Sequence, residues 1–183
     1  MTDFVQQYPH GLILAMDQMS LYFQATLTRV WSPIGQTPIV RVSPQRDHLH
    51  FYGAFDVRGG REIAMTTLEE TSLITANFLM ILLSLFPSQP ILLLLDRAPW
   101  HFGADIDQLV ADSDRLHLLY FPPACPELNP QEHVWEQARQ AIGHNHMYAR
   151  FGTLVDAFDT YLNDTPFDIC FMEKYAPPIL CEV

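Results

Sequence analysis

The sequence predicts an α/β fold in which a mixed sheet is flanked by helices. In the first third of the chain, apolar and β-branched runs are separated by turn residues, which is typical of an antiparallel meander. The remainder alternates helical periodicity with short, continuously apolar runs, as in β-α-β units with parallel strands. The chain has 183 residues, about the length of one domain, and 49% of them are hydrophobic, which is enough for a sizeable core.

The first third is expected to supply three antiparallel strands. Turn residues separate its apolar runs, with one turn at 32–36 and a hairpin turn at 58–60. The runs that favour strand lie at residues 11–16, 21–31, 39–42, 48–56 and 61–67.

The rest of the chain is expected to alternate helices with two parallel strands, at 91–95 and 116–121. Asn129, Pro130 and Glu132 are residue types preferred at the cap, the first position and the third position of a helix. Apolar spacing and such start signals predict helices at 68–86, 103–111, 129–142 and 153–162.

The stretch 73–95 carries no charged residue and is long enough to cross a bilayer. Pro87 and Pro90 interrupt it, so we expect a buried helix followed by a buried strand and no membrane span. Three cysteines without a C-x-x-C pair and an N-terminus without a signal-peptide pattern favour a reducing cytoplasm. No repeat or linker divides the sequence, so residues 1–183 are expected to form a single domain.

The charge is acidic and unevenly distributed. There are 21 acidic and 10 basic residues, a net charge of −11, which disfavours wholesale electrostatic binding of nucleic acid. Residues 1–61 carry five Arg and four Asp, whereas residues 62–183 carry five basic and seventeen acidic groups. A solvated face is the simple interpretation of the first group, and DNA contact is the alternative. The candidate DNA-binding residues are Arg29, Arg41, Arg46, Arg58 and Arg61.

Two acidic residues follow apolar strand segments, Asp17 after 12–16 and Asp96 after 91–95. Ligands collect at the carboxyl ends of parallel strands, so the two carboxylates meet at one edge if these strands are neighbours. Such a pair suits Mg²⁺, which prefers carboxylate oxygens. The alternative is that each Asp ends a strand or starts a turn.

Glu132, in the first turn of a predicted helix, is the third candidate carboxylate. A Glu at this position also completes a capping box, and the two roles do not exclude each other. Glu136 follows one helical turn later on the same face and is the rival third carboxylate. His101 is a candidate partner of Asp96, with packing in its loop as the alternative.

Three sequence motifs resemble those of a known family. Residues 121–135 (FPPACPELNPQEHVW) resemble the P-P-x-S-P-E-L-N-P-I-E-x-x-W signature of DDE transposases, in the bacterial insertion-sequence branch of the mariner-like superfamily. Residues 96–101 (DRAPWH) resemble its D-N-A-x-x-H motif, and residues 29–36 resemble its R-x-W-x-P-x-G turn. Asp17 resembles the first catalytic Asp of that family, so the similarity extends over about residues 12–161.

The resemblance implies an RNase H-like fold, with three antiparallel strands followed by two parallel strands and flanking helices. It also implies that Asp17, Asp96 and Glu132 bind two Mg²⁺ or Mn²⁺ ions and catalyse DNA cleavage and strand transfer. The implied partners are transposon-end and target DNA, a second copy in a homodimer, and no membrane. A helix-turn-helix domain is not expected before the first catalytic strand, so a separate helix-turn-helix polypeptide is a further possible partner.

The chain departs from the family motifs at Gln18, Arg97 and Cys125, where Glu, Asn and Ser are usual. None of these changes removes a carboxylate. Arg97 places a positive charge beside Asp96, where it can weaken metal binding or bind a phosphate. Together with His101 and Glu136, it is a candidate partner around the catalytic residues. Two alternatives stay open, namely a degenerate or domesticated domain without catalysis and a stand-alone RNase H-like nuclease.

Overall fold

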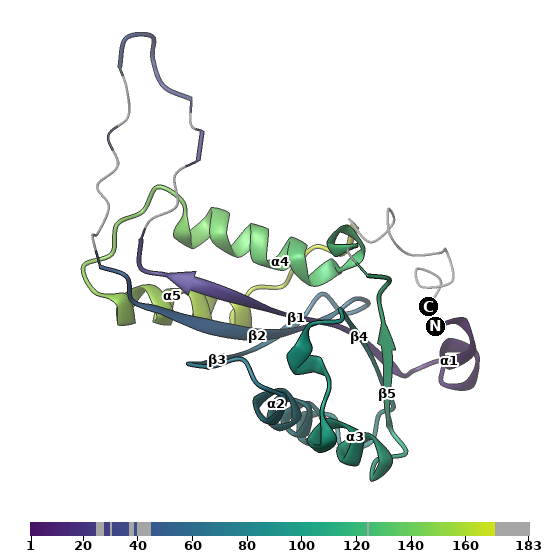
Figure 1. The fold of residues 1–183 in the computed structure, drawn as a ribbon. Helices are drawn as coiled ribbons and strands as arrows, with labels where there is room; N and C mark the ends of the chain where they lie inside the picture. The colour runs from purple at the N-terminus through teal and green to yellow at the C-terminus, as the bar shows by residue number, and fades with distance from the viewer. Residues whose placement is uncertain (25–27, 30, 37–38, 40–44, 124, 171–183) are drawn as a thin grey trace.

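The computed structural model describes residues 1–24, 28–29, 31–36, 39, 45–123 and 125–170. A single five-stranded sheet runs through the molecule in the order β3-β2-β1-β4-β5 (Figure 1). The pairs β1–β2 and β2–β3 are antiparallel, whereas β1–β4 and β4–β5 are parallel, which confirms the predicted fold class. The strands are β1 (Leu12–Tyr22), β2 (His48–Asp56), β3 (Glu62–Thr67), β4 (Ile91–Leu95) and β5 (Leu116–Tyr120).

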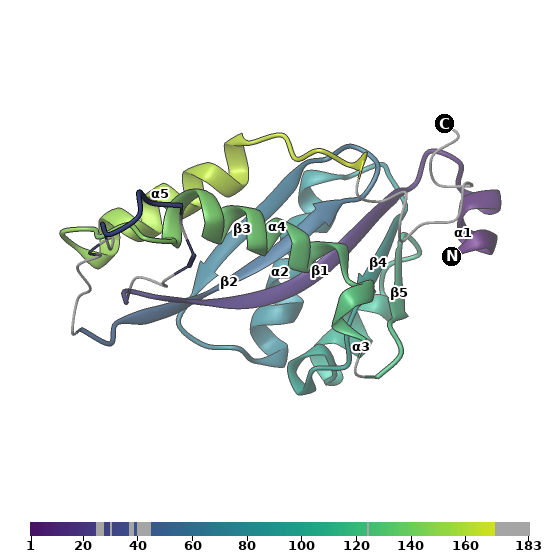
Figure 2. The same ribbon diagram turned by 90° about the horizontal axis from the view of Figure 1, so that it is seen from above.

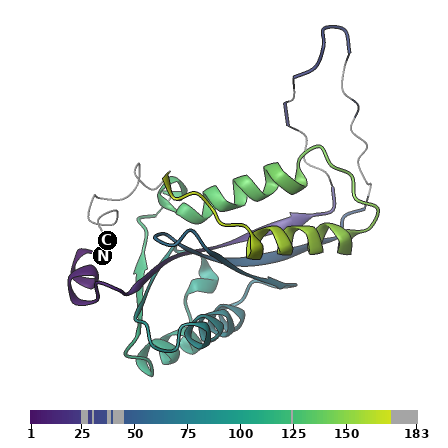
Figure 3. The same cartoon turned by 180° about the vertical axis from the view of Figure 1, so that it is seen from behind.

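Helices cover both faces of the sheet. Helices α4 and α5 lie over one face, and α2 and α3 lie over the other (Figures 1 to 3). The helices are α1 (Thr2–Gln7), α2 (Ser72–Leu85), α3 (Ala104–Ala111), α4 (Pro130–Ala138) and α5 (Phe151–Asp164). Short turns of helix lie at η1 (Pro99–His101), η2 (Pro126–Leu128) and η3 (Arg139–Gly143).

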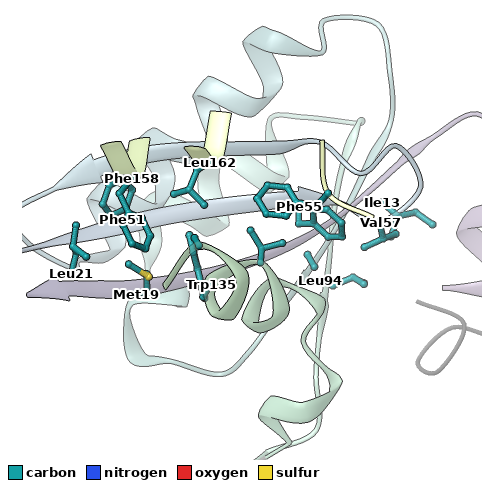
Figure 4. Close-up of a cluster of buried hydrophobic side chains, with 14 of the residues drawn as sticks. Ile13, Met19, Leu21, Phe51, Phe55, Val57, Leu94, Trp135, Phe158 and Leu162 are labelled. Carbon is teal, nitrogen blue, oxygen red and sulfur yellow. The ribbon is translucent and has the colours of Figure 1, made fainter. Parts of the chain in front are cut away.

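Alternation along β1 divides the core into two layers. Ile13 and Ala15 pack into the cluster beneath α4 and α5, which also contains the fully buried Trp135 (Figure 4). Leu14 and Met16 point to the other face and pack with α2 and α3. The side chain of Asp17 therefore belongs to the α4 face of the sheet, which fixes where the acidic site is built.

Strand β4 lies inside the sheet between β1 and β5, and all five of its residues are buried. Helices on both faces explain its continuous apolar sequence. The uncharged stretch 73–95 is thus the helix α2 followed by the strand β4, as predicted. In the part of the chain that the structure describes, no helix is both long enough and apolar enough to cross a membrane.

Several predicted boundaries are wrong. The predicted strand end at residue 16 is wrong because β1 continues to Tyr22, so Asp17 lies inside a strand. The predicted strand at 21–31 is also wrong, since its described residues beyond Tyr22 are not in a strand. The predicted strand at 39–42 lies outside the described residues except for Ile39, which is not in a strand. Helix α1 was not predicted.

The predicted helix boundaries shift for local reasons. Helix α2 begins at Ser72 and not at residue 68, because the Thr71 hydroxyl caps it by accepting from the Ile74 N–H at 3.2 Å. The predicted helix 129–142 is α4 followed by the π-helical turn η3. The β2–β3 hairpin turn is confirmed, with the Gly60 N–H donating to the Asp56 carbonyl at 2.9 Å and a positive φ of 68° at Gly60.

Candidate functional site

The site forms where β1 and β4 separate. Their parallel register ends at the pair Ala15–Leu94, and two residues further along each strand come Asp17 and Asp96. Asp17 stays inside the sheet because it pairs on its other side with Gly53 of β2. Asp96 directly follows the last residue of β4. The two carboxylates are therefore carried at the same level of neighbouring strands, as the sequence predicts for a shared edge.

Helix α4 is attached to this edge at its N-terminus. The Asn129 side chain caps the helix by accepting from the Gln131 N–H at 3.2 Å, and its amide donates to the Met16 carbonyl at 3.3 Å. One turn further, the Trp135 indole N–H donates to Oδ2 of Asp17 at 3.3 Å. These contacts hold the first turn of α4, which contains Glu132, above β1.

Glu132 is not needed to complete a capping box. The Asn129 N–H, which a capping-box Glu would bind, donates instead to the Pro126 carbonyl at 2.9 Å. The Glu132 side chain is exposed and lines a cavity of about 330 Å³ together with Asp17 and Asp96. Glu136 does not line this cavity but lies beside Glu132 on a neighbouring one. The structure thus brings together the three predicted acids and leaves Glu136 out.

The carboxyl group of Asp17 is the most strongly perturbed acid of the three. Burial raises its pKa to about 7, and the charges of Glu132 and Asp96 act in the same direction. The Gln18 N–H and the Trp135 indole oppose this rise but do not cancel it. Near neutral pH, the Asp17 side chain therefore holds a proton for much of the time when no cation is bound.

Asp96 is in the opposite electrostatic situation. A hydrogen bond from His101 lowers its pKa, and the Ala98 N–H contributes by donating to Oδ1 at 3.0 Å. His101 Nδ1 lies 2.8 Å from the same oxygen, and the imidazole is fully buried. Asp96 therefore stays ionised, and the position of its carboxylate is fixed from behind. This contact agrees with the prediction that His101 is a partner of Asp96.

The far side of His101 is held by Gln18. The Trp100 indole can only donate, so the 2.6 Å contact makes Gln18 Oε1 an acceptor. His101 Nε2 lies 2.8 Å from Gln18 Nε2 and 3.0 Å from Gln18 Oε1. On the other side of the ring, His101 Nδ1 faces two acceptors of Asp96, Oδ1 at 2.8 Å and the backbone carbonyl at 3.1 Å, so Nδ1 carries a proton and donates it to Asp96. The glutamine at this departure from the family motif thus holds the histidine that contacts Asp96.

Arg97 is exposed at the mouth of the cavity. Its guanidinium carbon lies 5.7 Å from the centre of the Tyr120 ring, over which the charge is stacked. Tyr120 is in turn stacked on Phe102, with the ring centres 4.9 Å apart, and its hydroxyl donates to the His101 carbonyl at 3.1 Å. Arg97 is therefore a positive group that lines the acidic cavity without forming an ion pair with Asp96.

The arginines predicted to contact DNA do not form one patch. Arg41 lies outside the described residues, and Arg29 and Arg46 are exposed in the segments between β1 and β2. Arg58 and Arg61 lie in the β2–β3 turn, at the other end of β2. Their role in DNA binding stays a prediction.

The Arg58 guanidinium is already engaged within the protein. Its NH1 group donates to the carbonyls of Pro9 and Gly11, at 3.0 and 3.4 Å. These bonds tie the segment before β1 to the hairpin turn, so a structural role accounts for Arg58.

The carboxylates fit a hard divalent cation by their chemistry. Among the described residues, no group of three His, Cys, Asp or Glu side chains is gathered closely enough to hold a metal ion as it stands. Nonetheless, carboxylate oxygen is the ligand that Mg²⁺ prefers, and the pKa of Asp17 is raised by burial and by the negative charges of Glu132 and Asp96, which a bound cation would offset. Binding a cation would require the three side chains to draw together within the cavity.

Sequence reasoning missed two buried polar side chains beside the site. Glu62 opens β3 and is 1% exposed, and Gln131 precedes Glu132 and is fully buried. Their hydrogen bond, from Gln131 Nε2 to Glu62 Oε1, is 2.8 Å long. Glu62 follows Arg61 in a hairpin and resembles an ordinary surface acid in sequence. Gln131 gives a clearer signal, since it replaces the Ile of the transposase signature.

The sequence matches the family of DDE superfamily endonucleases over residues 12–155. An "Uncharacterized protein y4pE/y4sA" of Sinorhizobium fredii is 33% identical over 63 residues, which cover 34% of this chain and 44% of that protein.

Solved transposase structures share the fold. The Mos1 transposase paired-end complex with left transposon end has a TM-score of 0.69 at 13% identity, over 98% of this chain and 55% of that chain. The Mos1 mariner paired-end complex with Mg has a TM-score of 0.67 at 15% identity, over 93% and 54%. The catalytic domain of Mos1 mariner transposase has a TM-score of 0.63 at 13% identity, over 98% and 82%. This chain thus spans about half of the transposase chains in the complexes, and the RNase H-like fold is confirmed.

Proposed function

This chain belongs to the DDE superfamily endonuclease family, and we propose that it cleaves DNA phosphodiester bonds and transfers the resulting strand ends. The observation that carries the proposal is the convergence of Asp17, Asp96 and Glu132 on one cavity from β1, from the end of β4 and from α4. The resemblance assigns these three positions to the catalytic residues. Mg²⁺ or Mn²⁺ is the proposed cofactor, with two ions bound.

Each acid has a distinct part in the proposed site. Asp17 feels the charges of both other acids, so it is the carboxylate best placed to be shared between two ions. Asp96 is ionised and held by His101, which makes it a ready ligand. Glu132 is exposed on the first turn of α4 and supplies the third carboxylate. Bound divalent ions would activate the attacking hydroxyl and stabilise the leaving oxygen of the phosphodiester.

Other residues prepare the cavity for a phosphodiester. The Arg97 guanidinium can donate to a non-bridging phosphate oxygen, because it is exposed at the mouth and always charged. Phe121, Pro122 and Pro123 line the cavity with apolar groups, which limits the access of competing water. Proline backbone also keeps this loop stiff, so this wall of the cavity is held in place.

DNA is the proposed partner. Mos1 transposase is found with transposon-end DNA, and this chain shares the fold of its catalytic domain. We propose that residues 1–183 act as a catalytic domain, that end recognition comes from a helix-turn-helix segment or polypeptide outside these residues, and that two copies act together. A cytoplasmic location is part of the same proposal.

A nicking assay tests the function. Purified full chain would be incubated with supercoiled plasmid DNA and Mn²⁺ or Mg²⁺, and the loss of supercoils measured on a gel. Wild-type protein is expected to nick the DNA only with the metal, and Asp96→Asn and Glu132→Gln are expected to be inactive. Glu136→Gln is the matched control, because Glu136 lies one turn from Glu132 but outside the cavity. Equal nicking by wild type and Asp96→Asn would refute the proposal.

The same assay separates the alternatives. Metal binding that depends on Asp96, without nicking of any DNA, would mean that the site is intact and that the missing part is DNA recognition. Equal effects of the metal on wild type and Asp96→Asn would favour a domesticated domain that keeps the fold without catalysis. Cleavage of an RNA–DNA hybrid in preference to duplex DNA would favour a stand-alone RNase H-like nuclease.

A further inference from the structure

A second buried acid lies behind the catalytic cavity. Glu62 is the first residue of β3, and it is 1% exposed under the layer formed by α4 and α5. Its carboxyl group has no cation beside it among the described residues. An isolated buried carboxylate is costly, so such a group is normally paired or neutral.

The partner of Glu62 is the amide of Gln131, in the first turn of α4. Gln131 Nε2 donates to Glu62 Oε1 at 2.8 Å. Both groups converge over Gly53, where an added Cβ would collide with Glu62 Oε1 and lie 2.5 Å from Gln131 Nε2. Gly53 is also the β2 residue paired with Asp17, so this contact is built directly behind the catalytic carboxylate.

One donor is missing from this contact. Glu62 Oε2 and Gln131 Oε1 are both buried, and neither has a hydrogen-bond partner among the described residues. Both are acceptors as long as Glu62 is ionised, so they cannot satisfy each other. A single proton on Oε2 would supply the donor that this pair of acceptors lacks.

We propose that Glu62 is a neutral carboxylic acid that forms a cyclic, doubly hydrogen-bonded pair with the Gln131 amide, and that this pair positions Glu132. Oε2–H of Glu62 donates to Gln131 Oε1 while Oε1 accepts from Gln131 Nε2. The electrostatics agree, since burial raises the pKa of Glu62 well above its ordinary value and the charge of Asp17 adds to the rise. The hydrogen bonds from the Gln131 amide and the Ala54 N–H oppose this rise but do not cancel it.

The pair sets the position of α4 relative to β3. Asn129 ties the start of α4 to β1, and Gln131 ties it to β3, so the residue that follows, Glu132, is held from two strands. Gln131 stands where the transposase signature has Ile, so here a directional contact replaces an apolar one. Glu62 and Gln131 are thus positioning residues for Glu132, a role that rests on the proposed function.

Other titratable groups surround the pair, and they also contribute to the pH dependence of stability. The variants that are compared must therefore all contain them. Asp17 is the group whose charge acts on Glu62. The neighbouring strands and helices also carry His48, His50, Tyr52, Asp56, Glu132, His133, Glu136, Asp156, Asp159, Tyr161 and Asp164. Because every variant keeps these groups, their contributions largely cancel in a difference between two proteins.

The first experiment substitutes Glu62→Gln, which keeps the shape and permits a cyclic amide–amide pair. The direction of the pH effect follows from the raised pKa of Glu62, whose ordinary value in an unfolded chain is 4.5. Because the folded state binds the extra proton, wild type loses stability as the pH rises above 4.5. The unfolding constant of wild type should therefore increase relative to Glu62→Gln, by up to about tenfold per pH unit. Glu69→Gln removes an exposed acid beyond the other end of β3 and should show no such trend.

Infrared spectroscopy detects the proton itself. At pH 8, where Asp17 is mostly ionised, wild type should show the carbonyl band of a protonated carboxylic acid that Glu62→Gln lacks. Absence of a band difference would overturn the proposal. Equal losses of stability in Glu62→Gln and Glu62→Ala at every pH would also overturn the proposal. They would show that an amide cannot replace the Glu62 side chain, which is the result expected if Glu62 is ionised.

A double variant that carries both Glu62→Gln and Gln131→Glu exchanges the two side chains and tests the positioning role. We call this double variant the swap. Gln131→Leu should weaken Mn²⁺ binding by several-fold, and the swap, which re-creates an acid–amide pair, should restore both stability and Mn²⁺ affinity. A swap that restores stability but not affinity would overturn the positioning role. If the infrared band is present and no variant binds Mn²⁺, the pair stands and the proposed nuclease function fails.

Discussion

Replacing Asp17 by Asn should stabilise the metal-free protein at alkaline pH. The amide has the shape of the carboxyl group, and its oxygen can still accept from the Trp135 indole. It carries no charge, so burial does not penalise it and Glu132 and Asp96 do not repel it. A gain in stability on mutation is what distinguishes a functional acid from one that supports the fold.

The size of the gain follows from the pKa of Asp17. A rise from 3.8 to about 7 corresponds to roughly 4 kcal/mol, at about 1.4 kcal/mol for each pH unit. Because Asp17 lines an open cavity, solvent screens its charge, and we expect about 1–3 kcal/mol. The folded state binds the extra proton, so wild type loses this stability between about pH 4 and pH 7, whereas Asp17→Asn does not.

Urea unfolding at pH 4, 6 and 8 in the presence of a chelator measures the effect. The difference between Asp17→Asn and wild type should be near zero at pH 4 and largest at pH 8. Adding Mn²⁺ at pH 8 should stabilise wild type and remove most of the difference, since the ion binds only the charged site. A difference that does not change with pH, or an Asn variant that is less stable at pH 8, would refute the reasoning.

Three further predictions concern the site and its support. Millimolar Mg²⁺ should raise the melting temperature of wild type, measured by calorimetry, by about 5 °C, and that of Asp96→Asn by less than half as much. Equal shifts in the two proteins would contradict a metal site at Asp96. Gln18→Met should cost about 1–3 kcal/mol in urea unfolding, because it leaves the buried His101 Nε2 and the half-buried Trp100 indole N–H without this partner; an unchanged stability would contradict this. Gly53→Ala should cost about 1–3 kcal/mol through overpacking. Gly152→Ala is its control, because nothing lies within 4 Å of the new methyl group, and it should stabilise α5 by up to about 1 kcal/mol. Similar effects of the two substitutions on stability would contradict the crowding at Gly53.

The parts of the fold that could be predicted are those that local sequence determines. The apolar run of β4 is continuous because helices cover both of its faces, and Asn129 caps α4 as its residue type suggests. The end of β1 could not be predicted, because a polar pair at Asp17 and Gln18 interrupts its apolar run. That pair lies inside the strand only because β2 continues to pair with it, which is a long-range contact.

The candidate site shows the same division. The motif resemblance identified Asp17, Asp96 and Glu132, and the structure brings them to one cavity. The support around them depends on partners distant in sequence, such as the contact between Gln131 and Glu62, which are 69 residues apart. Spacing along the chain carries no information about such a contact until the sheet is assembled.

The most direct test of the account is the position of bound Mn²⁺. A crystal of the wild-type chain grown or soaked with Mn²⁺ would show the ions by anomalous scattering. We expect peaks coordinated by oxygens of Asp17, Asp96 and Glu132, and no such peaks in a crystal of Asp96→Asn. Ions bound only elsewhere, or an empty cavity at millimolar Mn²⁺, would contradict the claim that these three carboxylates form the catalytic metal site.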